Sequence, residues 1–382
     1  MSLDTLISTF DTSWAGVVKQ KTPQFVAGYQ DETIRNHMLL AYLRKYGRIT
    51  VNNGGPMCVW NAKYNQQAVE ATGDVGELTF NRWDLQRQLA TNWRGYVATD
   101  AMTELEYLQV KGSTGQILNR YAEVIPSLME ALSDHFSGQL FVDGNASENE
   151  NKIHGIESFM GATSSAVGNI VSAPSDSYAG HSTVLGTESG SSWSTGLASG
   201  DRPNATLAND FPHGSGSVSY NWHSPLLLNY GSTAWGTSTN TWEANCERAI
   251  RQGVIWLTNL GGPKGRPKMC MLDSFLYTGY ANHQAAKQRI QIPHQETQDL
   301  GFGDSLNQEG VAISYGYDVP GGVGYLINVA NVELASMNSQ LFGYRGPDWD
   351  MPTRSFLFYA GFWGNARWRT RHFAKLANYA SS

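Results

Sequence analysis

The sequence predicts a mixed α+β fold from three of its stretches. Between Lys111 and Gly144, apolar residues recur every three or four positions, which is typical of one face of a long helix. Between 241 and 292, helical patterns alternate with short apolar runs, as they do in an α/β layer. From 311 to 362, several stretches alternate apolar and polar residues, which indicates strands.

The composition limits the classes of protein to consider. With 382 residues the chain can form two or three domains with a sizeable core. Charged residues make up only 16%, against about 25% in an average protein, while the chain contains 12 Trp. Such a chain has much surface to bury, either in a large aromatic core or against other subunits or sugars. The net charge of −6 and the lack of a basic tract argue against dedicated nucleic-acid binding.

The cysteines and the N-terminus indicate in which cellular compartment the protein is expected. Cys58, Cys246 and Cys270 are odd in number, and their spacing matches no zinc or redox motif. We expect three buried thiols in a reducing compartment such as a cytoplasm. The N-terminus lacks the regions of a signal peptide, and no stretch is apolar enough for a transmembrane helix, so no membrane partner is expected.

The first third of the chain predicts an arm followed by a hairpin. Residues 1–30 show no clear periodicity and are expected to form an arm that a partner must order. A helix over 34–46 and a strand over 48–51 follow. Residues 57–111 contain short strand-like runs, the last at 103–110, but no apolar core of their own. We expect an extended antiparallel hairpin that lies on something else, because two strands alone are marginally stable.

The long helix is predicted from 115 to 137, roughly 34 Å at the standard rise per residue. Ser113 and Gln116 have capping-box spacing at its start, and Gly138 can end it. Pro126 lies near the middle of the helix. We expect it to bend the helix, because the ring removes a backbone donor and clashes one turn back.

The rest of the chain is expected to alternate strands and helices. A short strand at 140–144 leads to a Gly-Ile turn at 155–156. Residues 160–240 are rich in Gly, Ser and Thr but contain aromatics, which predicts a loop-rich β segment. The other expected elements are helices at 241–261 and 273–288 and strands at 268–272, 289–292, 311–319, 325–337 and 355–362.

Several short phrases, in this order, carry a resemblance to a known fold. They are Phe141-Val-Asp-Gly144, Gly155-Ile156, Lys268–Leu272, Asp318–Gly322 and Arg371–Lys375, and they accompany the long helix. The succession of arm, hairpin, long helix, α/β domain and β return resembles the major capsid proteins of tailed bacteriophages, which have the HK97 fold. The resemblance extends from one end of the chain to the other.

The resemblance implies a division of the chain into six parts. They are an N-terminal arm (1–54), an extended hairpin or E-loop (55–112), a peripheral domain with the spine helix (113–150), an axial domain (151–318), return strands of the peripheral domain (319–365) and a C-terminal segment (366–382). The stretch at about 160–240 would be an insertion or loop of the axial domain. Because the chain starts almost at the arm, no fused scaffolding domain is expected before it.

The same resemblance implies a structural protein and not an enzyme, with no catalytic residue, cofactor or metal. The chain would assemble with itself, as pentamers and hexamers, into an icosahedral shell that packages double-stranded DNA through weak, nonspecific contacts. Further implied partners are a portal protein, a separate scaffolding protein and a cement or decoration protein. The protein would be made in the host cytoplasm and reside in the capsid of the virion.

Three tryptophans in the hairpin region, Trp60, Trp83 and Trp93, are the candidate contacts between subunits. In a monomer the hairpin region has little hydrophobic core that could bury these side chains, and buried aromatic anchors are common at subunit contacts. The alternative is that one of them pins the hairpin to its own peripheral domain. Some shells of this fold join a hairpin lysine to a neighbour's asparagine. Lys63 and one of Asn328, Asn331 and Asn338 would form such a pair, but a solvated lysine is the simpler interpretation.

Two other functions stay open at this point. An encapsulin-like compartment would have the same fold around a different cargo. A carbohydrate-binding β protein, which belongs to another class, is motivated by the 12 Trp. A phosphate loop at Gly261–Gly265 is not expected, because the Gly-Lys-Ser/Thr ending is missing and a proline removes one backbone donor.

Overall fold

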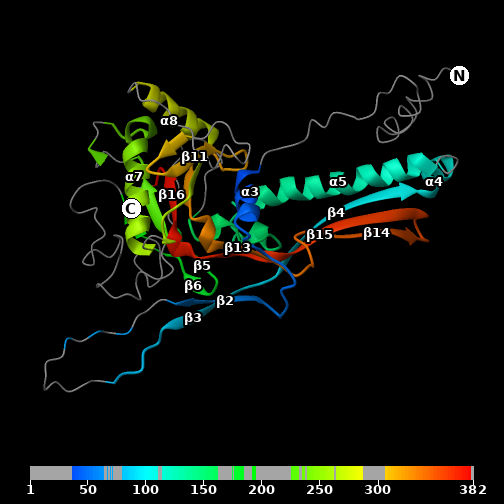
Figure 1. The fold of residues 1–382 in the computed structure, drawn as a ribbon, viewed down its shortest axis with the longest axis horizontal. Helices are drawn as coiled ribbons and strands as arrows, with labels where there is room; N and C mark the ends of the chain where they lie inside the picture. Colours follow the sequence, from blue (N-terminus) through cyan, green and yellow to red (C-terminus); the bar gives the residue numbers. More distant parts are fainter. Residues whose placement is uncertain are drawn as a thin grey trace. The chain divides into compact units, whose positions relative to one another are not determined.

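The computed structural model describes residues 37–63, 67, 69, 71, 80–110, 114–161, 174, 176–184, 192–194, 225–231, 235–236, 239–261, 264–286 and 306–379. These residues form two compact units. Unit 1 comprises the described residues of 96–135 and 342–361, and unit 2 those of 37–95, 136–341 and 362–379. Helices and strands occur in both units, so the predicted α+β fold is confirmed (Figure 1).

A seven-stranded sheet forms the centre of unit 2. Its strand order is β10 (Leu306–Gln308), β11 (Val311–Tyr315), β9 (Met269–Leu272), β12 (Gly324–Ile327), β16 (Phe373–Ala377), β8 (Leu226–Asn229) and β7 (Ser192–Ser194). Parallel and antiparallel pairs are mixed within it. Strands β9, β12, β16 and β8 are buried along their whole length, which explains their nearly continuous apolar sequences.

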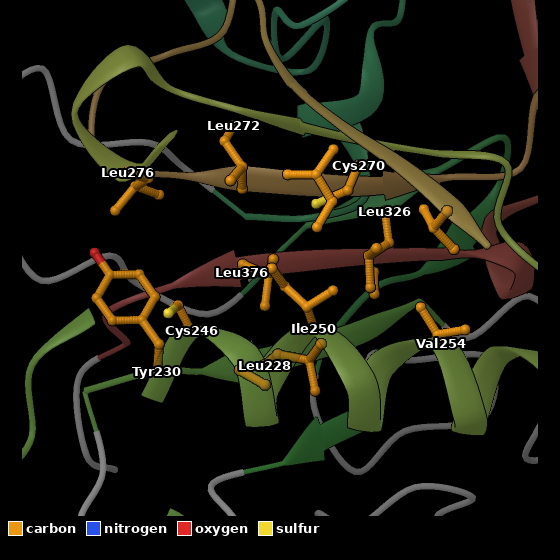
Figure 2. Packing of buried hydrophobic residues seen from close by; sticks show 14 of the residues in the cluster. Leu228, Tyr230, Cys246, Ile250, Val254, Cys270, Leu272, Leu276, Leu326 and Leu376 are labelled. Carbon is orange, nitrogen blue, oxygen red and sulfur yellow. The ribbon is translucent and has the colours of Figure 1, made fainter. Parts of the chain in front are cut away.

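Helix α7 (Trp242–Gly261) packs on this sheet with the face that its sequence predicts. All the expected residues of that face are buried: Trp242, Cys246, Ala249, Ile250, Val254 and Leu257. Figure 2 shows Ile250 and Val254 pointing from the helix toward the strands. Gly253 permits the close approach, because a Cβ there would lie 2.5 Å from Leu326 and 2.7 Å from Leu228. Each fully buried leucine or isoleucine contributes about 1.5–3 kcal/mol to stability.

Asp273 begins helix α8 (Ser274–Ala286), as predicted. Its carbonyl accepts a hydrogen bond from the Tyr277 amide at 2.8 Å, which closes the first turn. Its carboxylate accepts from the Gly322 amide at 3.1 Å. Asp273 therefore starts the helix and also ties it to the turn that precedes β12. The rest of the predicted helix and the strand at 289–292 lie outside the described residues.

The single strand predicted over 325–337 is wrong. The chain forms β12 in the seven-stranded sheet, then the 3-10 helix η6 (Val329–Asn331), then β13 (Val332–Ser336) in another sheet. Asn328 makes the break: its side-chain oxygen accepts from the Ala330 amide at 3.2 Å, and its amide donates to the Lys264 carbonyl at 2.6 Å. These local bonds compete with a continuous strand ladder.

The first described helix belongs to the core of unit 2. Helix α3 (Met38–Lys45) and strand β1 (Ile49–Thr50) match the helix and strand predicted there, as far as the residues are described. The buried residues of α3 are Met38, Leu39, Leu40, Tyr42 and Leu43. Strand β1 pairs in parallel with β13. Residues 38–50, which were expected within the N-terminal arm, are thus part of a folded unit, because α3 buries most of its apolar side chains there.

Unit 1 is built on the first half of strand β15 (Ser355–Trp368). Strand β14 (Gly343–Asp350) pairs with β15 in antiparallel orientation, and β4 (Arg94–Thr103) also pairs with it. Strand β14 was not expected from the sequence, because its Gly-Pro step is unfavourable for a strand. A register shift between Arg345 and Asp348 accommodates that step.

The strand-like run expected at 103–110 is wrong, because residues 104–110 form helix α4 (Glu104–Val110). The Thr103 amide donates to the Glu106 carboxylate at 2.8 Å, and the Thr103 hydroxyl accepts from the Glu106 amide at 3.3 Å. This is a capping box, and its Thr-x-x-Glu pattern is visible in the sequence.

The long helix α5 (Thr114–Gln139) confirms the central prediction from the sequence. Pro126 lies inside it on an exposed position, and the helix is continuous through that residue. The expected bend stays a prediction. The capping box proposed from Ser113 involves a residue outside the described part of the chain.

The short strand expected at 140–144 is wrong. The amides of Leu140, Phe141 and Val142 donate to carbonyls three residues earlier, so the chain leaves α5 in tight turns. The freed carbonyls of this turn then accept from the amides of Gly155 and Ile156, at 3.0 and 2.8 Å. The expected Gly-Ile turn is confirmed and leads into the 3-10 helix η2 (Ile156–Ser158).

Candidate assembly surfaces and a buried ion pair

The predicted hairpin exists in unit 2. Strand β2 (Cys58–Lys63) pairs with β3 (Gln86–Thr91) in antiparallel register, from Cys58 opposite Thr91 to Lys63 opposite Gln86. Its own core is small: Leu89 is buried and is covered by Trp60, Ala62 and Ala179. Most of the expected stretch 55–112 that follows β3 is not hairpin, because β4 and α4 continue into the other elements described above.

Two of the three candidate tryptophans contact their own chain. The ring of Trp60 lies 6.2 Å from the ring of Tyr178, so it holds the hairpin against residues 177–182. The indole nitrogen of Trp93 donates to the Gly55 carbonyl at 2.9 Å and closes the base of the hairpin. These contacts favour the alternative in which a tryptophan pins the hairpin to its own subunit.

Trp83 differs from both, because 39% of its surface is exposed. Two further apolar residues between β2 and β3 are almost fully exposed: Val69 at 97% and Phe80 at 90%. Together these side chains present apolar surface that no described residue of the chain covers. Such surface is typical of a contact with another protein molecule.

The base of the hairpin is anchored by a charged group. The Arg367 guanidinium of β15 donates to the Cys58 sulfur at 3.2 Å and to the Glu333 carboxylate at 3.1 Å. Burial raises the pKa of the Cys58 thiol, and Arg367 only partly offsets that effect. Cys58 therefore stays a neutral thiol. All three cysteines are free and buried, as expected.

A buried ion pair joins β16 to the 3-10 helix η2. The Lys375 ammonium lies 2.6 Å from the Glu157 carboxylate, and the two side chains are 0% and 2% exposed. Lys375 also donates to the Gly161 carbonyl at 3.2 Å, and Tyr325 of β12 donates its hydroxyl to the second oxygen of Glu157. The pair thus fixes three segments to one another within unit 2.

Burial dominates the protonation equilibria of this pair. It raises the pKa of Glu157 and lowers the pKa of Lys375, and the attraction between them only partly opposes these shifts. Neither group can titrate freely, since each charge is stabilised mainly by the other. The arrangement is structural, because both side chains are buried and engaged with groups of unit 2.

His154 gives unit 2 a dependence on pH. Its backbone is held by β15, since the amide donates to Asn365 at 3.1 Å and the carbonyl accepts from the Trp368 indole at 2.8 Å. Burial, with the nearby Arg94 charge, lowers the pKa of His154 to about 4. A lowered pKa means that the folded state binds fewer protons than the unfolded chain, so stability falls as the pH decreases.

We therefore expect the free energy of unfolding to fall by about 3 kcal/mol between pH 6.5 and pH 4 through this residue. His154→Gln removes the titrating group, so its stability should change less over the same interval, whatever its absolute stability. Urea unfolding at a series of pH values, followed by circular dichroism, measures both slopes. Equal slopes for the two proteins would contradict the assignment.

The described residues offer little else for chemistry. None of them form a group of three or more His, Cys, Asp or Glu side chains that could hold a metal. Lys63 is exposed, whereas Asn328 is buried and both ends of its amide are bonded within the chain, so this asparagine is not accessible to a lysine of another subunit. No helix in the described part of the chain has the length and hydrophobicity that crossing a membrane requires.

Comparison of structures shows which known proteins share this fold. The capsid of the empty GTA particle is similar with a TM-score of 0.55 and 12% identity, over 96% of this chain and 98% of that chain. The cyanophage A-1(L) capsid is similar with a TM-score of 0.52 and 13% identity, over 95% and 99% of the two chains. The capsid of the native GTA particle gives a TM-score of 0.50 at 12% identity, over 95% and 99%.

The chain has the HK97 capsid fold. The resemblance derived from its ordered sequence phrases is therefore confirmed at the level of the fold. No protein-family model matches the sequence, and comparison with curated proteins finds no match either. At 12 to 13% identity, the likeness of three-dimensional structure carries this conclusion, and the sequence alone does not.

The seven-stranded sheet combines strands from stretches that were expected in different parts of the chain. Strands β9 and β11 lie within 151–318, whereas β12 and β16 lie outside that range but in the same sheet. The two strands come from the stretches expected as return strands and C-terminal segment. They are central because β12 pairs with both β9 and β16, and β16 pairs with β8.

Proposed function

We propose that this protein is the major capsid protein of a tailed bacteriophage and assembles into an icosahedral shell around double-stranded DNA. One observation carries the proposal: the fold matches capsid subunits over nearly the whole length of both chains. In this proposal β2 and β3 form the E-loop, α5 is the spine helix, and the seven-stranded sheet forms the axial domain.

The partners follow from the same proposal. Pentamers and hexamers of the chain make the shell, and a portal protein occupies one vertex. A separate scaffolding protein and a decoration protein are the further partners. With a net charge of −6 the chain has little attraction for phosphate, so DNA contact is weak and nonspecific. The shell then withstands the packaged DNA through contacts between subunits, and the protein resides in the virion.

The carbohydrate-binding alternative loses much of its motivation. It rested on the number of tryptophans, and Trp235, Trp242, Trp256 and Trp368 are buried in the described units. These side chains serve packing and are not available to a sugar. Sugar-dependent tryptophan fluorescence in a soluble monomer would be needed to revive this alternative.

Negative-stain microscopy of the expressed protein tests the proposal directly. Closed shells are expected, with DNA in particles purified from infected cells. Closed shells that enclose an enzyme and no DNA would indicate an encapsulin-like compartment instead. A protein that stays monomeric at high concentration, with scaffolding protein present, would contradict a role as a shell subunit.

Trp83→Ala is expected to fold normally and to assemble poorly. Because 39% of the Trp83 surface is exposed, its removal should cost the fold less than loss of a buried side chain, whereas an aromatic anchor at a subunit contact typically contributes about 2 kcal/mol or more. Trp60→Ala is the matched control, because Trp60 packs on Tyr178 of its own chain and its loss should lower stability first. Circular dichroism and sedimentation of both variants separate the effects. Normal shells from Trp83→Ala would show that this side chain is not a contact.

A further inference from the structure

The turn between β1 and β2 contains the single Asn-Gly step of the sequence, Asn53-Gly54. An asparagine that precedes glycine is especially prone to lose its side-chain amide, because glycine has no Cβ to hinder attack of its backbone nitrogen on the asparagine side chain. Gly54 is exposed, and no atom lies within 4 Å of the position that a Cβ would occupy there. The site is therefore uncrowded and open to water.

The nitrogen that would react is not engaged elsewhere. The Gly54 amide donates a hydrogen bond to none of the residues that the structure describes. The sequence has one Asp-Gly step, Asp143-Gly144, which can form the same ring, but there the buried Gly144 amide donates to the Ser158 hydroxyl at 2.9 Å. A nitrogen held in this way must break its hydrogen bond before it attacks. The two steps share their chemistry, and the structure favours reaction at Asn53.

The Asn53 side chain ties β1 to β13 through its amide nitrogen, Nδ2. This nitrogen donates to the carbonyl and the hydroxyl of Thr50, both at 3.1 Å, and to the Ser336 carbonyl at 3.2 Å. The Thr50 hydroxyl gives its own hydrogen to the Leu334 carbonyl at 3.3 Å, so it acts as an acceptor toward Asn53. All three partners are thus acceptors, and only a donor at position 53 suits them.

We propose that Asn53 is a site of spontaneous deamidation, and that the reaction loosens the pairing of β1 with β13. The Gly54 nitrogen bonds to the side-chain carbon Cγ of Asn53, the bond from Cγ to Nδ2 breaks, and the proton of the Gly54 amide leaves with Nδ2 as ammonia. Water then opens the resulting succinimide at either carbonyl and gives aspartate or isoaspartate. Because three acceptors hold Nδ2, we expect a slow reaction over the lifetime of the protein.

The product no longer fits the hydrogen bonding of this turn. A carboxylate only accepts, so it faces two carbonyl oxygens and a hydroxyl oxygen with no hydrogen to share. Isoaspartate also lengthens the backbone, which shifts the amide of residue 53 from the Ser336 carbonyl, to which it donates at 3.0 Å. The same turn holds the base of the hairpin, because the Gly55 carbonyl accepts from the Trp93 indole. Deamidation therefore loosens the hairpin base, whether or not the protein forms a shell.

Peptide mapping of aged protein tests the chemistry. Purified full-length protein is kept at mildly alkaline pH for several weeks and compared with a fresh sample. Trypsin, which cleaves after Arg48 and Lys63, releases one peptide that contains Asn52, Asn53 and Asn61. Fragmentation in the mass spectrometer should locate the replacement of NH2 by OH at Asn53, in two products that separate as aspartate and isoaspartate. The other two asparagines, which precede larger residues, are internal controls and should stay intact.

Gly54→Ala is the matched variant for the reaction. Its methyl group meets nothing within 4 Å, so the fold should be unchanged, but the new side chain hinders attack by the backbone nitrogen. Asn53 of this variant should stay largely intact over the time in which the wild type converts half of it. Equal rates in the two proteins, or an Asn53 that reacts only after unfolding in urea, would overturn the modification site.

Hydrogen exchange tests the loosening separately. Asn53→Asp carries the product from the start, and it should lower the protection of the backbone amides in 48–53 and 332–338 by about tenfold. Asn61→Asp adds the same charge at an exposed position of the hairpin, so it is the control and should leave these amides as protected as in the wild type. Wild-type protection in Asn53→Asp would show that the turn tolerates the product, and would overturn the loosening.

Discussion

Lys375→Met is expected to lower the free energy of unfolding by about 3–5 kcal/mol, the cost of leaving a buried charge without its partner. Glu157 is 2% exposed and lies 2.6 Å from the ammonium, so no water can replace the lost charge without opening the core. Urea unfolding followed by circular dichroism measures the loss. A loss below about 1 kcal/mol would mean that the pair contributes far less than its burial indicates.

The pH dependence of this variant provides an independent check. Burial already raises the pKa of Glu157, and removal of Lys375 takes away the main opposing effect. A raised pKa means that the folded state takes up a proton more readily than the unfolded chain, so low pH favours folding. The deficit of Lys375→Met should therefore shrink as the pH falls and grow as it rises.

A double variant separates the ion pair from packing. In Glu157→Gln with Lys375→Met no charge remains, and the glutamine oxygen can still accept from Tyr325. This variant should be more stable than Lys375→Met alone, because replacing both partners of a buried pair costs less than removing one. Equal stability of the two variants would show that the lost volume, and not the orphaned charge, explains the effect.

Gly155→Ala should be among the most damaging substitutions of a single methyl group in this chain. A Cβ at Gly155 would lie 2.5 Å from the Val142 carbonyl oxygen and 2.6 Å from the Leu140 carbonyl oxygen. Both are backbone atoms, so no side-chain rotation relieves the clash. We expect a loss of about 3 kcal/mol or more, at the upper end of what overpacking usually costs.

Gly54→Ala is the matched control for that substitution. No atom lies within 4 Å of a Cβ at Gly54, and its backbone conformation is open to other residues. Its stability should stay within about 0.5 kcal/mol of the wild type. Thermal unfolding of both variants under the same conditions makes the comparison. A normal melting temperature for Gly155→Ala would mean that the turn after α5 moves more easily than its hydrogen bonds suggest.

Local patterns in the sequence were sufficient for much of the fold. The apolar face of α7 and the extent of α5 follow from spacing, because a helix repeats every 3.6 residues whatever surrounds it. The start of α8 at Asp273 follows from capping. The capping box of Thr103 and Glu106 is the same kind of local signal, and its Thr-x-x-Glu pattern in the sequence marks the start of α4.

Other parts required knowledge of distant neighbours. The break at Asn328 depends on the Lys264 carbonyl, 64 positions earlier in the chain. Residues 140–142 form turns instead of a strand. The amides of Gly155 and Ile156 donate to the carbonyls of Val142 and Leu140 and hold these turns in place. Neither partner is visible in the local pattern, which in both places looked like an ordinary strand.

For the candidate contact surfaces too, some features were predicted from the sequence and others appear only in the structure. The sequence identified the hairpin and its three tryptophans, since a stretch without its own apolar core must lie on something else. Only the structure separates Trp60 and Trp93, which contact their own chain, from Trp83, which is exposed. It also joins the start of α4 to the β14–β15 turn, more than two hundred positions away in sequence, through the hydrogen bond from the Glu104 amide to the Arg354 carbonyl.

By itself, then, the sequence determined the type and length of the main elements, the order that resembles a capsid subunit, and the burial of the cysteines, because periodicity, capping and composition act over a few residues. Tertiary structure decided which strands share a sheet and where charge is buried. Glu157 and Lys375 are 218 positions apart. A lysine in a strand of apolar residues looks exposed until the carboxylate that neutralises it is brought beside it, and only the folded chain brings it there.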